Sequence, residues 1–257
     1  MAARTTRRVL AIGAHPDDVE FLCAGTLVLL HEAGWRVNVA TMSAGDLGSA
    51  TLDREAIGAL RREEARRSAE MLKATYRCLD ARDFQIFFGD ELLRRTTALV
   101  RAVDPDLVLT HAPVDYLADH EETSRLVQHA CFAAPVKLYA TERDEPATAA
   151  IPHLYYADPV ELVDPYGQPV RPEFVVDVTA AMPMKELMLG CHSSQREWFR
   201  RQHGEDDYVA TMKRWSGQRG GLVGFAFGEG FRQHRGHAFP RTALLQDELS
   251  CASPPGE

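Results

Sequence analysis

Four consecutive residues near the N-terminus combine an imidazole with two carboxylates. His15, Pro16, Asp17 and Asp18 directly follow the apolar run 9–14, which predicts a buried strand. In α/β enzymes the groups that do chemistry gather at the carboxyl ends of such strands. His15 and Asp18 can both reach a divalent metal from one turn, and Asp17 would then lie beside a water held by that metal. The turn therefore predicts a metal site with its own general base.

A third metal ligand is predicted further along the chain. The apolar run 107–110 predicts a strand next to the first one, and the segment after it contains Asp119 and His120. His120 can therefore return over the His15 turn. Two histidines and one aspartate leave a fourth position for water, as in catalytic zinc sites. The same ligands also describe the facial triad of non-haem iron enzymes, so a second hypothesis is an iron site.

Alternating strands and helices are predicted around this turn. Strands are expected at 8–14, 35–42 and 107–110, and helices at 19–33, 53–73, 91–103 and 121–132. This order predicts an α/β fold, namely a Rossmann-like three-layer domain with a mostly parallel sheet flanked by helices. The pattern is weaker beyond residue 133, where short strands (154–156, 173–178) and helices (180–191, 205–215) are expected. The predicted fold also has a smaller C-terminal extension.

The length and composition predict one domain. The chain has 257 residues and 45% hydrophobic content, enough for a sizeable core. We expect a core at about 8–195, a C-terminal cap or oligomerisation region at about 196–246, and a tail at 247–257. A net charge of −8 argues against nucleic-acid or membrane partners and favours a small molecule. Five scattered cysteines indicate a cytoplasmic location.

These residues resemble the PIG-L, or LmbE-like, family of zinc-dependent N-acetylglucosamine deacetylases. The resemblance runs from Val9 to about Gln195. It is carried by His15-Pro16-Asp17-Asp18, Gly25-Thr26, the loop 41–48, Arg61, Glu64, Pro105-Asp106, Asp119-His120, Lys185 and His192-Ser193-Ser194-Gln195.

The resemblance implies a zinc-dependent hydrolase of linear amides. His15, Asp18 and His120 would bind Zn²⁺, and Asp17 would be the general base for a metal-bound water. The implied substrate is an N-acetylglucosaminyl-type or related N-acetylated small molecule. The family resemblance also implies a homo-oligomer, either a trimer or a hexamer.

One departure from the family motif concerns the oxyanion. Leu117 occupies the position where many members have a histidine that stabilises the tetrahedral oxyanion, and such a donor can contribute about 3 kcal/mol. His192, His234 and His237 are candidates to replace it. The departure also motivates a further hypothesis, a catalytically weak or inactive ligand-binding member of the same fold.

Four polar residues each have more than one interpretation. Arg61 can bind substrate hydroxyls or form an ordinary helical ion pair with Glu64. Asp46 can hold a substrate hydroxyl or satisfy the backbone of its own turn. Asp119 can support His120, pair with a late histidine, or cap the following helix. His192 likewise either contributes to the site or only complements the end of its helix.

Overall fold

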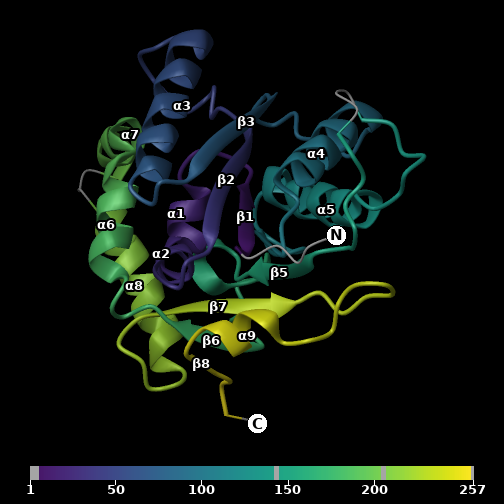
Figure 1. Ribbon diagram of the computed structural model, residues 1–257. Coiled ribbons are helices and arrows are strands. Elements are labelled where there is room, and N and C mark those ends of the chain that lie inside the picture. The colour runs from purple at the N-terminus through teal and green to yellow at the C-terminus, as the bar shows by residue number, and fades with distance from the viewer. Residues whose placement is uncertain (1–5, 142–144, 204–206, 256–257) are drawn as a thin grey trace.

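One eight-stranded sheet forms the centre of the molecule (Figure 1). The computed structural model describes residues 6–141, 145–203 and 207–255. The strands lie in the order β3-β2-β1-β4-β5-β7-β6-β8. The parallel half comprises β1 (Arg8–Gly13), β2 (Arg36–Ser43), β3 (Thr75–Ala81), β4 (Leu107–Thr110) and β5 (His153–Ala157). The predicted mostly parallel α/β sheet is confirmed.

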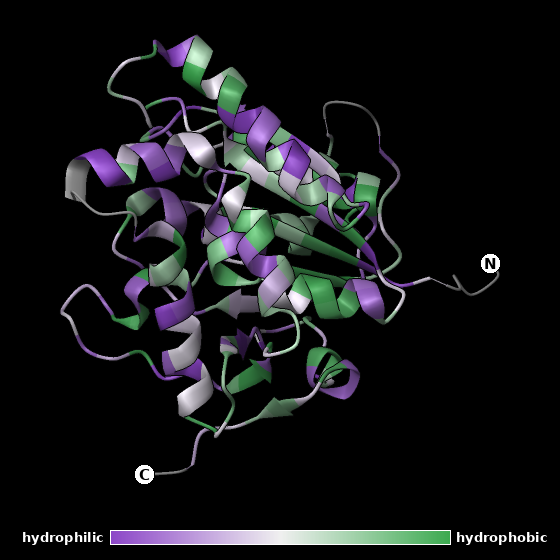
Figure 2. Cartoon of the chain, turned by 90° about the vertical axis from the view of Figure 1, so that its left-hand side faces the viewer, coloured by the Kyte–Doolittle hydropathy of each residue, from purple (hydrophilic) through white to green (hydrophobic). Residues whose placement is uncertain are grey.

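The helices cover both faces of this sheet. One face carries α1 (Asp18–Leu22), α2 (Ala24–Glu32), α3 (Arg54–Glu70), α6 (Met182–Gly190) and α8 (Tyr208–Gly221). The other face carries α4 (Asp90–Val103) and α5 (Ala118–Ala133), and α7 (Ser193–His203) packs between α3 and α8. Figure 2 shows apolar residues concentrated in the central strands and hydrophilic residues on the covering helices. These three layers bury two apolar cores, one on each side of the sheet.

The register of the strands sets the position of the loops that follow them. Ile12 of β1 pairs with Ala40 of β2 and with Thr110 of β4. The three strands therefore end at nearly the same level of the sheet. Because parallel strands present their carboxyl ends at one edge, the loops after β1, β2 and β4 meet there.

The predicted helix 19–33 is two helices in the structure. The break falls at Cys23, whose φ of −148° is not helical. The amides of Gly25 and Thr26 then donate to the carboxylate of Glu229, at 2.8 and 2.7 Å. A helix N-terminus has unpaired N–H groups and favours a negative charge. A carboxylate from the distant strand β7 therefore caps the start of α2.

The C-terminal third completes the sheet in antiparallel fashion. β7 (Gly228–Gln233) lies between β5 and β6 (Phe174–Asp177), and antiparallel to both. Where the sequence predicts a tail, α9 (Leu244–Glu248) and β8 (Cys251–Ala252) form, and β8 pairs with β6. Residues 256 and 257 of that tail, and 205 and 206 of the helix predicted at 205–215, lie outside the described residues.

The segment between α3 and α4 contains one strand and a loop. β3 covers 75–81, whereas 84–88 is a loop. A short 3-10 turn, η1 (Val160–Leu162), follows β5. In the part of the chain that the structure describes, we find no helix with the length and apolar character needed to cross a bilayer.

Candidate functional site

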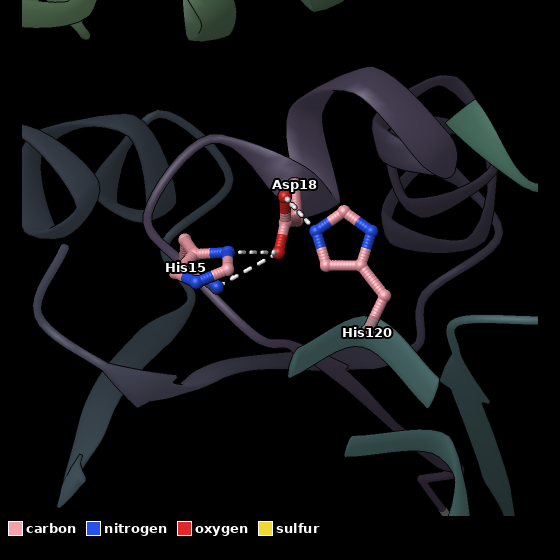
Figure 3. A group of neighbouring side chains, drawn as sticks. All are labelled: His15, Asp18 and His120. Atoms are coloured by element: carbon pink, nitrogen blue, oxygen red, sulfur yellow. Dashed lines mark hydrogen bonds and ion pairs between the residues drawn. The ribbon is translucent and has the colours of Figure 1, made fainter. Parts of the chain in front are cut away.

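Three side chains from two separate segments converge at the carboxyl edge of the sheet (Figure 3). His15 comes from the turn after β1, Asp18 is the first residue of α1, and His120 comes from the first turn of α5. His15 Nδ1 lies 3.6 Å from Asp18 Oδ2, and His120 Nε2 lies 3.6 Å from Asp18 Oδ1. One ligand atom from each residue lies within 4.8 Å of the others. This is close enough for a single metal ion to contact all three.

The turn that carries two of these residues has a constrained backbone. Asp17 has a φ of 97°, which is uncommon for a residue with a side chain. The backbone amide of His15 donates to Asp18 Oδ2 at 2.7 Å. A Cβ atom at Gly13 would lie 2.9 Å from Asp18 Cβ, so the close approach of this turn to β1 requires glycine.

A carboxylate orients each of the two histidines. Asp119 Oδ2 lies 3.0 Å from His15 Nε2, and Asp115 Oδ1 lies 2.9 Å from His120 Nδ1. Such contacts fix the ring and its tautomer, and they leave His15 Nδ1 and His120 Nε2 directed at Asp18. Asp119 thus contacts His15, and the residue that contacts His120 is Asp115. The sequence analysis did not single out Asp115. The feature that could have pointed to it is the presence of a carboxylate five residues before His120.

The charges around His15 favour a cation at this point. Burial alone would lower the pKa of His15, but hydrogen bonds to Asp119 and Asp18 and the charges of Asp18 and Asp83 raise it to about 10. The folded protein therefore concentrates negative charge around this ring. A divalent cation held by His15, Asp18 and His120 would supply the missing positive charge, so the residues present fit a metal ion.

A second group, His111, Asp115 and His120, fits a metal less well. The rings of His111 and His120 are stacked, with centroids 4.1 Å apart and planes at 17°. Stacked imidazoles direct their nitrogens along nearly parallel lines, which do not meet at one ion. The rings of His15 and His120 are inclined at 56° instead. His111 Nε2 lies 3.0 Å from Asp18 Oδ2. His111 directly follows β4, but the sequence analysis did not include it among the candidate site residues.

Two side chains hold Asp17 from opposite sides. Tyr208 Oη donates to Asp17 Oδ2 at 2.5 Å, and Arg61 Nη2 lies 3.3 Å from Asp17 Oδ1. Burial raises the pKa of Asp17, while the positive charge of Arg61 and the hydrogen bond from Tyr208 oppose that rise. Arg61 also donates to the carbonyl of Pro16 at 2.6 Å, and Glu64 accepts from Ser193 and Ser194. Arg61 therefore braces the turn itself. No sequence motif points to Tyr208.

A cavity of about 220 Å³ opens beside Asp17, Asp18 and His120. Its wall is mainly aromatic and is formed by α1, the loop before α5, α7 and α8. The aromatic members are Phe21, Tyr116, Trp198, Phe199, Tyr208 and Trp215. Substrate can therefore reach Asp17 through a largely apolar space.

The remaining predicted residues have other contacts. Asp46 Oδ1 accepts the backbone amide of Asp83 at 3.0 Å. His192 Nε2 lies 3.3 Å from Glu20 Oε1, and His234 Nδ1 lies 2.9 Å from the hydroxyl of Tyr156. His237 is exposed. Their predicted roles in substrate or oxyanion binding stay predictions.

Comparison with known proteins finds a family that resembles the N-terminal half of the chain. Residues 10–131 match the family model described as PIG-L, GlcNAc-PI de-N-acetylase. This stretch, which is just under half of the chain, is similar to the PIG-L family. This confirms the resemblance seen in the sequence. The matched PIG-L region includes His15, Asp17, Asp18 and His120, whereas Tyr208 lies outside it.

The relatives of this chain carry two kinds of names. A 4-oxalmesaconate hydratase of Pseudomonas putida is 28% identical, with 74% of each chain covered. A probable N-acetyl-alpha-D-glucosaminyl L-malate deacetylase 2 of Bacillus cereus is 26% identical, with 74% of this chain and 84% of the relative covered. The structure of N,N'-diacetylchitobiose deacetylase from Pyrococcus horikoshii superposes with a TM-score of 0.75 at 24% identity, covering 93% of this chain and 89% of that one. The last comparison confirms the fold.

Proposed function

We propose that this protein is a zinc-dependent hydrolase of N-acylated amines. The proposed substrate is an N-acetylglucosaminyl-type or related small molecule, and the proposed general base is Asp17. The observation that carries the proposal is the position of Asp17 in the wall of the cavity, next to the group formed by His15, Asp18 and His120.

His15, Asp18 and His120 would hold the metal. When bound, a zinc ion supplies Lewis acidity, which polarises an acyl carbonyl and makes water more acidic. Asp115 and Asp119 keep the two imidazole rings in the orientation that binding needs, through contacts of 2.9 and 3.0 Å.

Asp17 would move the proton. One carboxylate oxygen accepts the proton of the attacking water and then delivers it to the nitrogen of the leaving amine. Tyr208 and Arg61 hold the carboxylate in one orientation, through Oδ2 and Oδ1 respectively. A general base of this kind contributes about 10²- to 10⁴-fold to the rate.

Hydration of a carbon–carbon double bond is a second candidate reaction, because one relative is named a hydratase. It would use the same ligands and base. The substrate of that relative is a polycarboxylate by name, which calls for cationic side chains in the pocket. Among the described residues that line the cavity, none is a lysine or an arginine. We therefore favour amide hydrolysis.

The test is the release of free amine by zinc-loaded protein from a panel of N-acetylglucosaminyl compounds. Asp17→Asn should retain zinc and lose at least about 100-fold in rate, whereas Glu63→Gln, on the exposed side of α3, should match the wild type. A fully loaded wild-type protein that releases no amine but hydrates 4-oxalmesaconate would contradict the proposal. Binding without turnover, or activity with iron alone, would support the other two hypotheses. The cytoplasmic location and the homo-oligomer stay predictions.

A further inference from the structure

The cavity beside Asp17 has an aromatic wall whose members pack on one another. Phe21 of α1 meets Tyr208 edge to face at 5.1 Å and lies 5.6 Å from Trp215, measured between ring centroids. Phe199 of α7 lies 6.1 Å from Tyr208. Three helices therefore join to form one apolar surface that leads to the candidate base. Aromatic faces of this kind bind flat or apolar groups.

The polar groups in the same wall are already engaged within the protein. Tyr208 Oη donates to Asp17, Gln195 Nε2 donates to the carbonyl of Gly48, and Thr211 Oγ1 donates to Asp207. A ligand hydroxyl placed among them would lose its hydrogen bonds to water without gaining equivalent ones, which is unfavourable. The interior of the cavity is therefore poorly suited to a ring that carries many hydroxyl groups.

The charged groups in the wall are all acidic. Asp17 and Asp18 line the cavity, and in the described part of the wall there is no basic side chain except the imidazole of His120. Arg61 is directed to Asp17 and to the carbonyls of Pro16 and Gly45. Away from the proposed metal, a carboxylate on the substrate would thus find no cationic side chain to pair with.

The volume fits one ring-sized group. A cavity of about 150 Å³ with apolar walls is enough to bind a benzene ring, and this one measures about 220 Å³. The edge at Tyr116, which is 64% exposed, is open to solvent. The polar part of a substrate can stay at this edge while an apolar part fills the interior.

We propose that the substrate is an uncharged N-acylated amine bearing a ring-sized apolar group, which occupies the aromatic cavity next to Asp17. This inference rests on the amide-hydrolase function proposed above. The apolar group can belong to the acyl side or to the amine side of the amide. A carboxylate on that group should prevent it from binding.

The experiment compares matched substrates on zinc-loaded protein. N-acetylglucosamine is the reference, N-benzoylglucosamine places the ring on the acyl side, and the phenyl glycoside of N-acetylglucosamine places it on the amine side. The 4-carboxy analogues of the last two add charge without changing the ring. We expect at least one phenyl compound to have a kcat/KM about 10-fold or more above the reference, and its carboxy analogue to lose that gain. Equal values for all five compounds would overturn the inference.

Variants locate the effect in the cavity. Trp215→Ala and Trp198→Ala should remove most of the increase in kcat/KM that the phenyl group gives. Trp215→Phe keeps an aromatic ring and should retain most of that increase. Tyr166→Ala removes an aromatic side chain that is 87% exposed and should retain all of it. If Trp215→Ala and Trp198→Ala, both folded, keep the full gain, the cavity does not bind the apolar group.

A binding measurement separates this inference from the proposed function. Zinc-loaded Asp17→Asn should bind the favoured phenyl compound at least about 10-fold more tightly than N-acetylglucosamine, by calorimetry. If no compound is hydrolysed by the wild type but this preference is present, the proposed function fails and the cavity assignment holds. If amides are hydrolysed without any preference, only the cavity assignment fails.

Discussion

Tyr208 Oη lies 2.5 Å from Asp17 Oδ2, although 191 positions separate the two residues. The hydrogen bond connects α8, in the C-terminal third of the chain, to the turn after β1, near the N-terminus. It also leaves Asp17 with one oxygen directed toward Tyr208 and the other toward Arg61. The orientation of the candidate base therefore depends on the C-terminal third of the chain.

Tyr208→Phe should lower kcat about 10-fold and leave KM nearly unchanged. A hydrogen bond to a charged group contributes about 1.5–3 kcal/mol, and the phenyl ring keeps the packing against Phe21. Steady-state kinetics on zinc-loaded protein would measure the effect, with Tyr166→Phe as the control on an exposed tyrosine. An unchanged kcat would show that Asp17 does not need this hydrogen bond.

Asp119→Asn and Asp115→Asn should each weaken metal affinity by about 10- to 100-fold, because the carboxylate that orients a metal-binding histidine is lost. The contacts removed are those to His15 and His120. Competition with a coloured zinc chelator would measure the affinity. Glu63→Gln, on an exposed helix surface, should have no effect, and wild-type affinity in both aspartate variants would argue against the proposed ligands.

His192 and Glu20 should make stability depend on pH. Burial alone would lower the pKa of His192, but the charge of Glu20 raises it above 6.5. The resulting stabilisation is complete below pH 6.5 and is lost as the pH rises through the folded-state pKa. The pKa of Glu20 is lowered despite burial, so its contribution is present above pH 4.5 and is lost as the pH falls through the folded-state value.

Urea unfolding of metal-free protein between about pH 5 and pH 9 would test this dependence. His192→Gln should abolish the loss on the alkaline side. It should also cost about 3–5 kcal/mol near pH 6, because Glu20 stays buried without its counter-charge. A variant whose stability follows the wild-type curve across the range would show that the pair does not titrate as described.

Lys185→Met should destabilise the protein by about 3–5 kcal/mol, since it leaves the negative charge of the buried Glu229 carboxylate without a cation. Lys185 Nζ lies 2.6 Å from Glu229 Oε1, and both side chains are almost fully buried. Adding Glu229→Gln should recover part of the loss by removing the orphaned charge. Lys213→Met, at a half-exposed pair with Glu186, should cost at most about 1 kcal/mol. Equal losses at the two lysines would contradict this account.

The parallel half of the fold could be predicted because its strands are continuous apolar runs. β1 and β4 are buried on both faces, and such strands are recognisable from composition alone. The antiparallel half could not be predicted in the same way. β7 reads Gly-Glu-Gly-Phe-Arg-Gln, which has little apolar periodicity, and its place between β5 and β6 follows from long-range pairing.

The candidate site likewise has a part that the sequence predicts and a part that it does not. The convergence of His15, Asp18 and His120 follows from the adjacency of β1 and β4, which the strand pattern predicts; their role as ligands stays a prediction. Tyr208 and Glu229 could not be found this way. Each reaches the N-terminal turn region only through tertiary packing, and neither belongs to a motif with a recognisable spacing.

The cap that Glu229 places on α2 has a consequence for biosynthesis. A chain that leaves the ribosome N-terminus first exposes the His15 turn early, but Glu229, Tyr208 and the aromatic wall of α8 emerge much later. The nascent protein can therefore form its parallel strands without an oriented base. A polypeptide cut short before β7 would lack the carboxylate that pairs with Lys185, so the ammonium group of that lysine would have no counter-charge in the core.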